Sequence, residues 1–229
     1  MKKISIRFIV LACLFCGCKV LSVQYKTLPA EIPFPDSTAS VLLIDAAEIH
    51  TPGIAIRKKR EEVVTQIKND FIQQLPGAIL KDLGNPVLKN EQLYEETVVR
   101  LLNDDPAVCQ KVMTDHQVAM IIILKDCSGG FNQDEIVKEK DADGNTSKKA
   151  YYSVFFDTYV HIIQKERSWD KTISASKQHS SRTVLSGLLA RGPGYQANKK
   201  SIAAMANENM HKLTALFREQ RVAVNGWTK

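Results

Sequence analysis

The strongest strand signal in the chain is the run Val118-Ala119-Met120-Ile121-Ile122-Ile123-Leu124. An uninterrupted apolar run of this length is typical of a strand buried on both faces, and such a strand lies inside a sheet, away from its edges. Val41-Leu42-Leu43-Ile44 is a shorter run of the same kind. The two runs predict the buried strands around which the other elements pack.

Helical periodicity appears on both sides of the central run. Apolar residues recur at helical spacing between residues 56 and 75, and Pro76-Gly77 is expected to end or kink that helix. Asp105-Pro106 has the form of an N-cap followed by proline at the first helical position, so a helix is expected to start there. Residues 91–102 and 201–217 show the same periodicity and predict two further helices.

Two long strands are expected in the second half of the chain. Residues 151–164 are rich in aromatic and β-branched side chains, and residues 169–178 alternate apolar with polar side chains. Residues 138–149 are polar and charged, and we expect them to form a protruding, mobile hairpin loop. Residues 222–224 predict a last edge strand.

This order of elements predicts an α+β fold. Helices come early and long strands come late, which favours a mixed, mainly antiparallel sheet with helices packed on it and long β-hairpin strands in the second half. We expect a single domain of this kind over residues 40–226.

The N-terminal segment has the architecture of an export signal. Three basic residues precede an apolar run at residues 8–15, and the run stops at Cys16-Gly17-Cys18. This pattern resembles the signal of bacterial lipoproteins, in which the chain is cut before a cysteine that has received a diacylglycerol. The resemblance implies a signal peptide over residues 1–17, lipid on Cys18, and a lipidated, proline-rich lead-in over residues 18–39.

Two details of the signal leave alternatives open. Phe15 stands where lipoprotein signals usually have Leu, and Val10-Leu11-Ala12-Cys13 is a competing match that leaves a shorter apolar stretch before the cut. A membrane-spanning helix would need about 20 apolar residues, and Lys19 ends the run well before that length. We therefore expect a cleaved signal with Cys18 as the lipid acceptor.

The body of the chain also resembles a known group of proteins. The order of elements over residues 40–217, with Asp105-Pro106 starting a helix that leads into an apolar strand, is similar to the domain shared by the curli secretion lipoprotein and the penicillin-binding-protein activator lipoproteins. That domain is related to the N-terminal domain of the Tol translocation protein. Leu28-Pro29-Ala30-Glu31-Ile32 also looks like the lead-in of an uncharacterised family of bacterial lipoproteins.

Net charge bears on the possible partners of the chain, and the position of the cysteines bears on a possible disulfide. The formal net charge is +6, but Lys2, Lys3 and Arg7 would leave with the signal, and the remaining weak basicity is no indication of nucleic-acid binding. Cys109 and Cys127 are the two cysteines of the body. We expect no disulfide between them. Counted from the turn at residues 116–117, the helix places Cys109 and the strand places Cys127 at very different distances, so the two thiols should be too far apart to bond.

The usual motifs of catalysis and metal binding do not appear. The five histidines are scattered without a paired ligand spacing, and the charged segment around Asp143 lacks the glycine and the glutamate of a calcium loop. We therefore expect no cofactor, no metal and no enzymatic activity. A hydrolase with a dispersed site remains an alternative if His161, Asp157 and Asp126 converge in one cleft. A ligand-binding protein remains another if a sizeable apolar cavity lies between helices and sheet.

The expected function is that of a membrane-anchored interaction or assembly module. Tyr151, Phe155 and Tyr159 lie on one face of their strand, and they are candidate partner-binding residues, as are Lys138 and Lys148 of the charged segment. We expect an envelope protein as the partner, and self-assembly into an oligomer is left open. The sequence after Cys18 lacks the acidic run that directs some lipoproteins to the cell surface, so we expect an outer-membrane protein that faces the periplasm.

Overall fold

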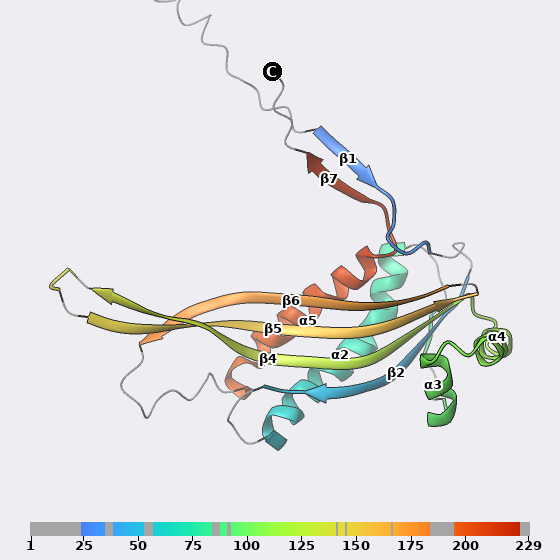
Figure 1. The fold of residues 1–229 in the computed structure, drawn as a ribbon, viewed down its shortest axis with the longest axis horizontal. Coiled ribbons are helices and arrows are strands. Elements are labelled where there is room, and N and C mark those ends of the chain that lie inside the picture. Colours follow the sequence, from blue (N-terminus) through green and yellow to red (C-terminus); the bar gives the residue numbers. More distant parts are fainter. Residues whose placement is uncertain are drawn as a thin grey trace, which may run out of the picture. The chain divides into compact units, whose positions relative to one another are not determined.

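Figure 1 shows a computed structural model of the chain. It describes residues 24–34, 39–52, 57–83, 88–90, 93–140, 142–144, 146–165, 167–183 and 195–224. The expected signal and Cys18 lie outside these residues. No helix in the described part of the chain combines the length and the apolar character needed to cross a membrane.

A five-stranded mixed sheet forms the framework. Its strands are β2 (Val41–His50), β3 (Leu88–Asn90), β4 (Met120–Lys140), β5 (Thr146–Gln164) and β6 (Arg167–Thr183), in the spatial order β3-β2-β4-β5-β6. The pairs of β2 with β3 and with β4 are parallel, and the pairs β4–β5 and β5–β6 are antiparallel. The predicted α+β class with a mainly antiparallel sheet is confirmed. The apolar run from Met120 becomes the first part of β4, in the middle of the sheet, as predicted.

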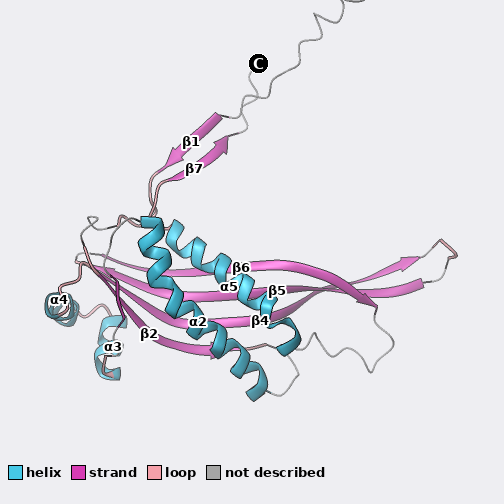
Figure 2. Cartoon of the chain, turned by 180° about the vertical axis from the view of Figure 1, so that it is seen from behind, coloured by secondary structure: helices cyan, strands magenta, loops and turns pink. Residues whose placement is uncertain are grey.

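Two helices cover one face of this sheet, which we call the inner face (Figure 2). They are α2 (Arg57–Leu83) and α5 (Lys199–Ala215), the latter preceded by a short 3-10 turn, Gln196–Asn198. Their apolar stripes and the inner side chains of the strands form the main core, in which Phe71 of α2 packs on Phe156 of β5 with ring centroids 5.8 Å apart. Burial of this apolar area is the main stabilising contribution to the fold.

The opposite face, the outer face, is covered at one end by α3 (Glu95–Leu102) and α4 (Pro106–Asp115). Their buried residues pack on the side chains of β2 and β4 that alternate with the inner ones, such as Ile44 and Ile123. The predicted start of α4 is confirmed, because the Asp105 carboxylate accepts hydrogen bonds from the backbone N–H groups of Ala107 and Val108.

The described chain divides into two compact units. Residues 30–218 form the larger one, and the smaller one holds β1 (Gln24–Leu28) and β7 (Gln220–Val224), which pair with each other as antiparallel strands. The larger unit thus begins before the expected residue 40 and ends before the expected residue 226. Its lead-in is part of the core, since Ile32 is fully buried and its N–H donates to the carbonyl oxygen of Leu216.

Two local expectations need correction: Pro76 does not end its helix, one of the two outcomes expected there, and residues 138–149 are not mainly a loop. Helix α2 continues through Pro76 to Leu83, because the buried residues Leu75 and Ile79 on either side of the proline hold both halves on the core. The segment 138–149 is mostly strand, since the pairing of β4 with β5 extends to Lys140 opposite Thr146. A polar strand pair is stable there because cross-strand hydrogen bonds involve the backbone, whatever the side chains are.

Candidate functional site

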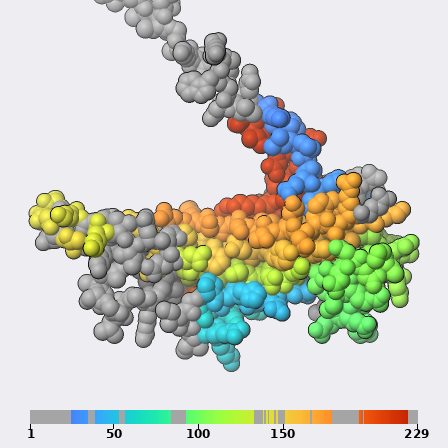
Figure 3. All heavy atoms as spheres, in the orientation of Figure 1, coloured from blue at the N-terminus to red at the C-terminus, as the bar shows by residue number. Residues whose placement is uncertain are grey.

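The outer face away from α3 and α4 carries the surface that could bind a ligand or partner. Figure 1 looks onto this face, with α2 and α5 behind the strands, and no other described helix lies over it. Figure 3, in the same orientation, shows β2, β4, β5 and β6 side by side at this surface. A depression of about 590 Å³ lies at the border of this face, where the C-terminal end of β2 and the start of α2 meet β4 and β5. Its lining residues are Ile49, His50, Thr51, Pro52, Arg57, Glu61, Ser128, Asn132, Phe155 and Asp157.

The predicted aromatic row lies on this face, but its rings are not equally accessible. Phe155 is only 6% exposed and forms part of the wall of the depression. Tyr151 and Tyr159 are half-buried. The Lys125 ammonium group lies 4.5 Å from the centroid of the Tyr159 ring, a cation–π contact that covers part of that ring. The accessible part of this row therefore consists of the two tyrosines more than of Phe155.

Lys138 and Lys148 lie directly opposite each other near the end of the β4–β5 hairpin. The side chain of Lys138 is exposed. Lys148 is three residues from Tyr151 along β5, so the lysine pair lies beyond the Tyr151 end of the aromatic row, on the part of the hairpin that is farther from the depression.

The three residues of the hydrolase alternative do not converge. Asp126 contacts His50, with Oδ1 3.2 Å from Nε2, and Asp157 accepts hydrogen bonds from the Ser174 hydroxyl and the Ala175 N–H. His161 is four residues from Asp157 along β5, about 13 Å at the rise of a strand, and its two ring nitrogens contact other groups. His161 therefore lies apart from Asp157, and these three side chains do not converge in one cleft.

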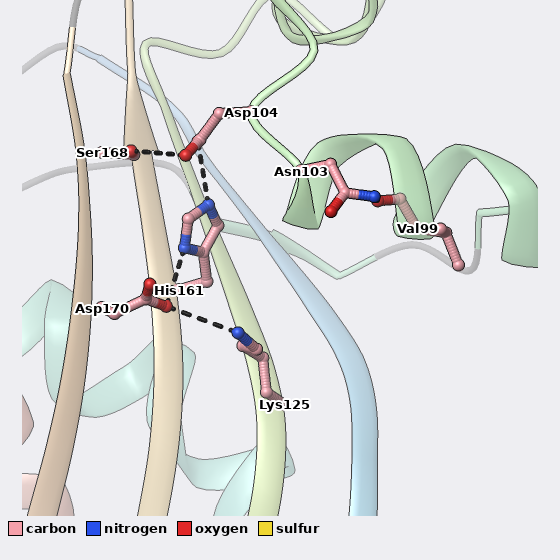
Figure 4. A network of polar contacts seen from close by, with 7 residues as sticks. All are labelled: Val99, Asn103, Asp104, Lys125, His161, Ser168 and Asp170. Carbon is pink, nitrogen blue, oxygen red and sulfur yellow. Dashed lines mark hydrogen bonds and ion pairs between the residues drawn. The ribbon is translucent and has the colours of Figure 1, made fainter.

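His161 is held between two aspartates (Figure 4). Its Nε2 lies 3.1 Å from Oδ1 of Asp104, and its Nδ1 lies 3.0 Å from Oδ1 of Asp170. An ionised carboxylate only accepts hydrogen bonds, so both contacts are satisfied together when both ring nitrogens carry a proton. Ser168 donates to the second oxygen of Asp104, and Lys125 lies 3.5 Å from Asp170.

This network holds the α3–α4 connection, residues 103–105, on the sheet. Asp104 belongs to the α3–α4 connection and has a φ of 53°, a conformation that aspartate tolerates better than most residues. Asp170 is on β6. Burial raises the pKa of the Asp170 carboxyl, but hydrogen bonds from His161 and Tyr159 and the charges of His161 and Lys125 outweigh it, so the net shift is downward. We therefore interpret the network as a structural contact that attaches the α3–α4 connection to β5 and β6.

The two body cysteines are free thiols, as expected. Cys127 is fully buried in the main core, and burial raises the pKa of its thiol to about 12. Cys109 on α4 is less buried, and burial together with the charges of Asp104 and Asp105 raises its pKa as well. Neither thiol is activated as a nucleophile.

A cluster that the sequence patterns did not reveal lies beside the depression. Glu48, His50 and Asp126 each offer a ligand atom, and these atoms all lie within 4.8 Å of one another. The only sequence signal is the alternation of Glu48 and His50 on one strand, because Asp126 joins them through the parallel pairing of β2 with β4.

No protein-family model matches the chain, and no curated protein matches it. Among solved structures it is similar to a Helicobacter pylori protein described as a homologue of the neuraminyllactose-binding hemagglutinin, at 10% identity and a TM-score of 0.44, covering 83% of this chain and 90% of that one.

Two further solved structures are similar. The hypothetical protein CT253 of Chlamydia trachomatis is 10% identical, with a TM-score of 0.38 over 78% of this chain and 95% of its own. A PelC dodecamer of Paraburkholderia phytofirmans is 11% identical, with a TM-score of 0.26 over 82% of this chain and 98% of its own. None of these likenesses assigns a function to the chain.

Proposed function

We propose that the chain is a lipoprotein of the bacterial envelope, anchored through lipid on Cys18, whose folded unit binds an envelope protein and catalyses no reaction. The anchor rests on the sequence alone, on the basic start, the apolar run at residues 8–15 and the Cys16-Gly17-Cys18 end. Two or three acyl chains on one cysteine exceed what stable membrane attachment requires. We place the protein in the outer membrane, facing the periplasm.

The observation that carries the binding role is the unequal covering of the sheet. The inner face packs against α2 and α5, whereas the outer face, within the described residues, has α3 and α4 at one end only. The open part presents mainly acidic and polar side chains around Tyr159. Its acidic members are Glu48, Asp126, Asp157 and Asp170. Such a surface fits a polar partner segment that carries basic residues.

The two alternatives have less support. The separation of His161, Asp157 and Asp126 removes the geometry on which the hydrolase alternative depended. The depression on the outer face is open and lined mostly by polar residues, in contrast to the apolar cavity between helices and sheet that a hydrophobic ligand would need. Self-assembly of the chain remains compatible with an open sheet face.

The anchor is tested by comparing the wild type with Cys18→Ser. We expect the wild type to carry a diacylglycerol-sized mass and to partition into detergent, and the variant to lose both properties. Cys13→Ser is the matched control and should behave as the wild type. If Cys18→Ser keeps the lipid mass, the acceptor is another cysteine, and if the wild type has none, the anchor proposal is wrong.

The binding face is tested by site-specific photo-crosslinking in cells that make the full chain. A photo-reactive residue replaces Thr172, which is exposed on the outer side of β6, and in a control it replaces Gln73, which is exposed on α2. We expect a defined envelope-protein adduct from the first position and none from the second. The adduct should disappear when Asp126 and Asp157 are both changed to Lys. Equal adducts from both positions, or none from Thr172, would contradict the proposed face.

A further inference from the structure

Glu48, His50 and Asp126 converge on the outer face because of how two distant segments pair. Glu48 lies directly opposite Asp126 in the parallel register of β2 and β4, and His50 lies opposite Ser128. Glu48 and His50 are two residues apart, so their side chains point to the same face of the strand. The Nε2 atom of His50 is 3.2 Å from Oδ1 of Asp126.

A β-bulge at Lys125 is what brings Asp126 to this face. Ile121 and Ile123 point outward and Leu124 points inward, yet Cys127 also points into the inner core. The register with β5 passes from Leu124 to Asp126 without a partner for Lys125, which is the extra residue. Without the bulge, simple alternation would turn Asp126 into the apolar core and Cys127 outward. Bulges often redirect a side chain beside a binding site, and this one completes the cluster.

The donor set has the chemistry of a transition-metal site. One imidazole nitrogen and two carboxylates suit Zn²⁺ and its neighbours in the first transition row, whereas Mg²⁺ and Ca²⁺ favour oxygen ligands alone. In a tetrahedral zinc site neighbouring ligand atoms are roughly 3.4 Å apart. The His50–Asp126 distance already matches this value. The side chains of His50 and Asp126 are 57% and 42% exposed, so they have the freedom to close on an ion.

The charges near the cluster also favour a cation. Two carboxylates face one imidazole, and Lys125, the residue before Asp126, contacts Asp170 and the Tyr159 ring. Arg57, which also lines the depression, pairs with Glu61 at 2.5 Å. His50 also lines the depression, so an ion at the cluster would lie at its rim.

We propose that Glu48, His50 and Asp126 bind one divalent transition-metal cation, with Zn²⁺ as the representative ion, at the rim of the outer-face depression. The three side chains leave at least one coordination position for water or for a donor atom of a bound molecule. The proposal does not rest on the lipid anchor or on a protein partner, because cation binding is a property of the folded chain itself.

The test is calorimetric titration of the metal-free, detergent-solubilised full chain with Zn²⁺, supported by the absorption spectrum of the Co²⁺ form. We expect one Zn²⁺ per chain with saturation below about 100 µM. His50→Ala should weaken binding at least about tenfold, since even the loss of a hydrogen-bond partner behind a ligand often costs that much. Glu48→Gln and Asp126→Asn should weaken it too. Mg²⁺ in excess should not displace Zn²⁺.

The matched control is His211→Ala, which removes an exposed histidine of α5 that lies 3.9 Å from Asp82. Its Zn²⁺ affinity should equal that of the wild type. Thermal melts of the metal-free variants confirm that each is folded before titration. Absence of saturable binding, displacement by Mg²⁺, or an equal loss of affinity in His50→Ala and His211→Ala would each overturn the proposal.

Discussion

Thr158 of β5 and Asn209 of α5 are joined by a hydrogen bond of 2.8 Å between two buried side chains. The Asn209 amide nitrogen also donates to the carbonyl oxygens of Phe156 and Ile173, at 3.0 and 2.6 Å. One helix side chain therefore contacts two neighbouring strands, and its amide oxygen and nitrogen are both satisfied without water. This contact fixes the position of α5 along the sheet in a way that apolar packing alone does not.

Asn209→Leu should lower the free energy of unfolding by about 3 kcal/mol, because it leaves the buried Thr158 hydroxyl and two backbone carbonyl groups without their partner. Adding Thr158→Val to this variant should recover part of the lost free energy, because it removes the hydroxyl group that was left without a hydrogen-bond partner. Asn207→Leu is the control, because Asn207 is exposed on the same helix. Chemical denaturation of the wild type, the two single variants and the double variant measures their free energies of unfolding. A loss in Asn209→Leu no larger than in Asn207→Leu would show that the buried contact contributes nothing.

Gly130 and Gly129 are adjacent in β4 but should respond very differently to alanine. A Cβ atom on Gly130 would lie 2.1 Å from the Tyr195 hydroxyl oxygen, and its φ of 152° is unfavourable for other residues. Tyr195 has little freedom to move, because its hydroxyl oxygen lies 2.7 Å from the carbonyl oxygen of Pro52 and 3.2 Å from that of Gly129, which share its single donor proton. A Cβ atom on Gly129 would meet Phe156 and Val64 at 3.2 and 3.4 Å, which small shifts relieve.

We expect Gly130→Ala to lower the free energy of unfolding by about 3 kcal/mol, from backbone strain and displacement of the tyrosine, and Gly129→Ala to cost about 1 kcal/mol or less. Equilibrium denaturation of the two variants beside the wild type measures the difference. Equal costs for the two alanines would mean that Tyr195 is not held as the structure has it.

The sequence predicted the elements whose signals are local. The apolar run of β4, the helical periodicities and the Asp105 cap each depend on a few neighbouring residues, and all three are present. The β-rich character of residues 138–149 was missed because strand pairing through the backbone leaves no apolar pattern in an exposed hairpin. Pro76 indicates an end or a kink of the helix because its lost hydrogen bond is a local cost, whereas the burial that lets α2 continue past it is not local.

The candidate site could not be predicted for a related reason. His50 and Asp126 are 76 residues apart, and they meet only through a parallel strand pair whose register the sequence does not display. The bulge at Lys125 changes which face Asp126 occupies, and no residue type marks it. Residues 151–164 lie in one strand, as expected, but the low exposure of Phe155 depends on the residues packed around it, which the sequence does not display.

The two body cysteines should resist modification to different degrees. Cys127 is buried with a thiol pKa of about 12, so at pH 8 it should be alkylated by iodoacetamide only after unfolding. Cys109 is partly accessible, so it should react slowly in the folded protein despite its raised pKa. Peptide mass spectrometry after timed labelling reports each cysteine separately. Labelling of Cys127 as fast as Cys109 under native conditions would contradict its place in the core.

Asp170 and Asp157 should affect stability in opposite directions as the pH changes. Burial raises the pKa of Asp170, but the hydrogen bond from His161 and the other contacts lower it further, to below the ordinary value of 3.8. Its ionised form therefore stabilises the fold above pH 3.8, and this contribution is lost as the pH falls through the lower folded-state value. Burial raises the pKa of Asp157 above 3.8, so its ionisation opposes folding increasingly as the pH rises from 3.8 through the folded-state value.

Asp170→Asn should therefore lower the melting temperature at pH 7, and Asp157→Asn should raise it. The Asp157→Asn difference should fade as the pH falls through the raised folded-state pKa of Asp157 towards 3.8. The Asp170→Asn difference should fade only below pH 3.8, as the pH falls through the lowered folded-state pKa of Asp170. Melting temperatures from pH 7 to pH 3 measure the two curves on the same scale. A loss of stability in Asp157→Asn at pH 7 would mean that the hydrogen bonds from Ser174 and Ala175 outweigh the cost of burying its charge.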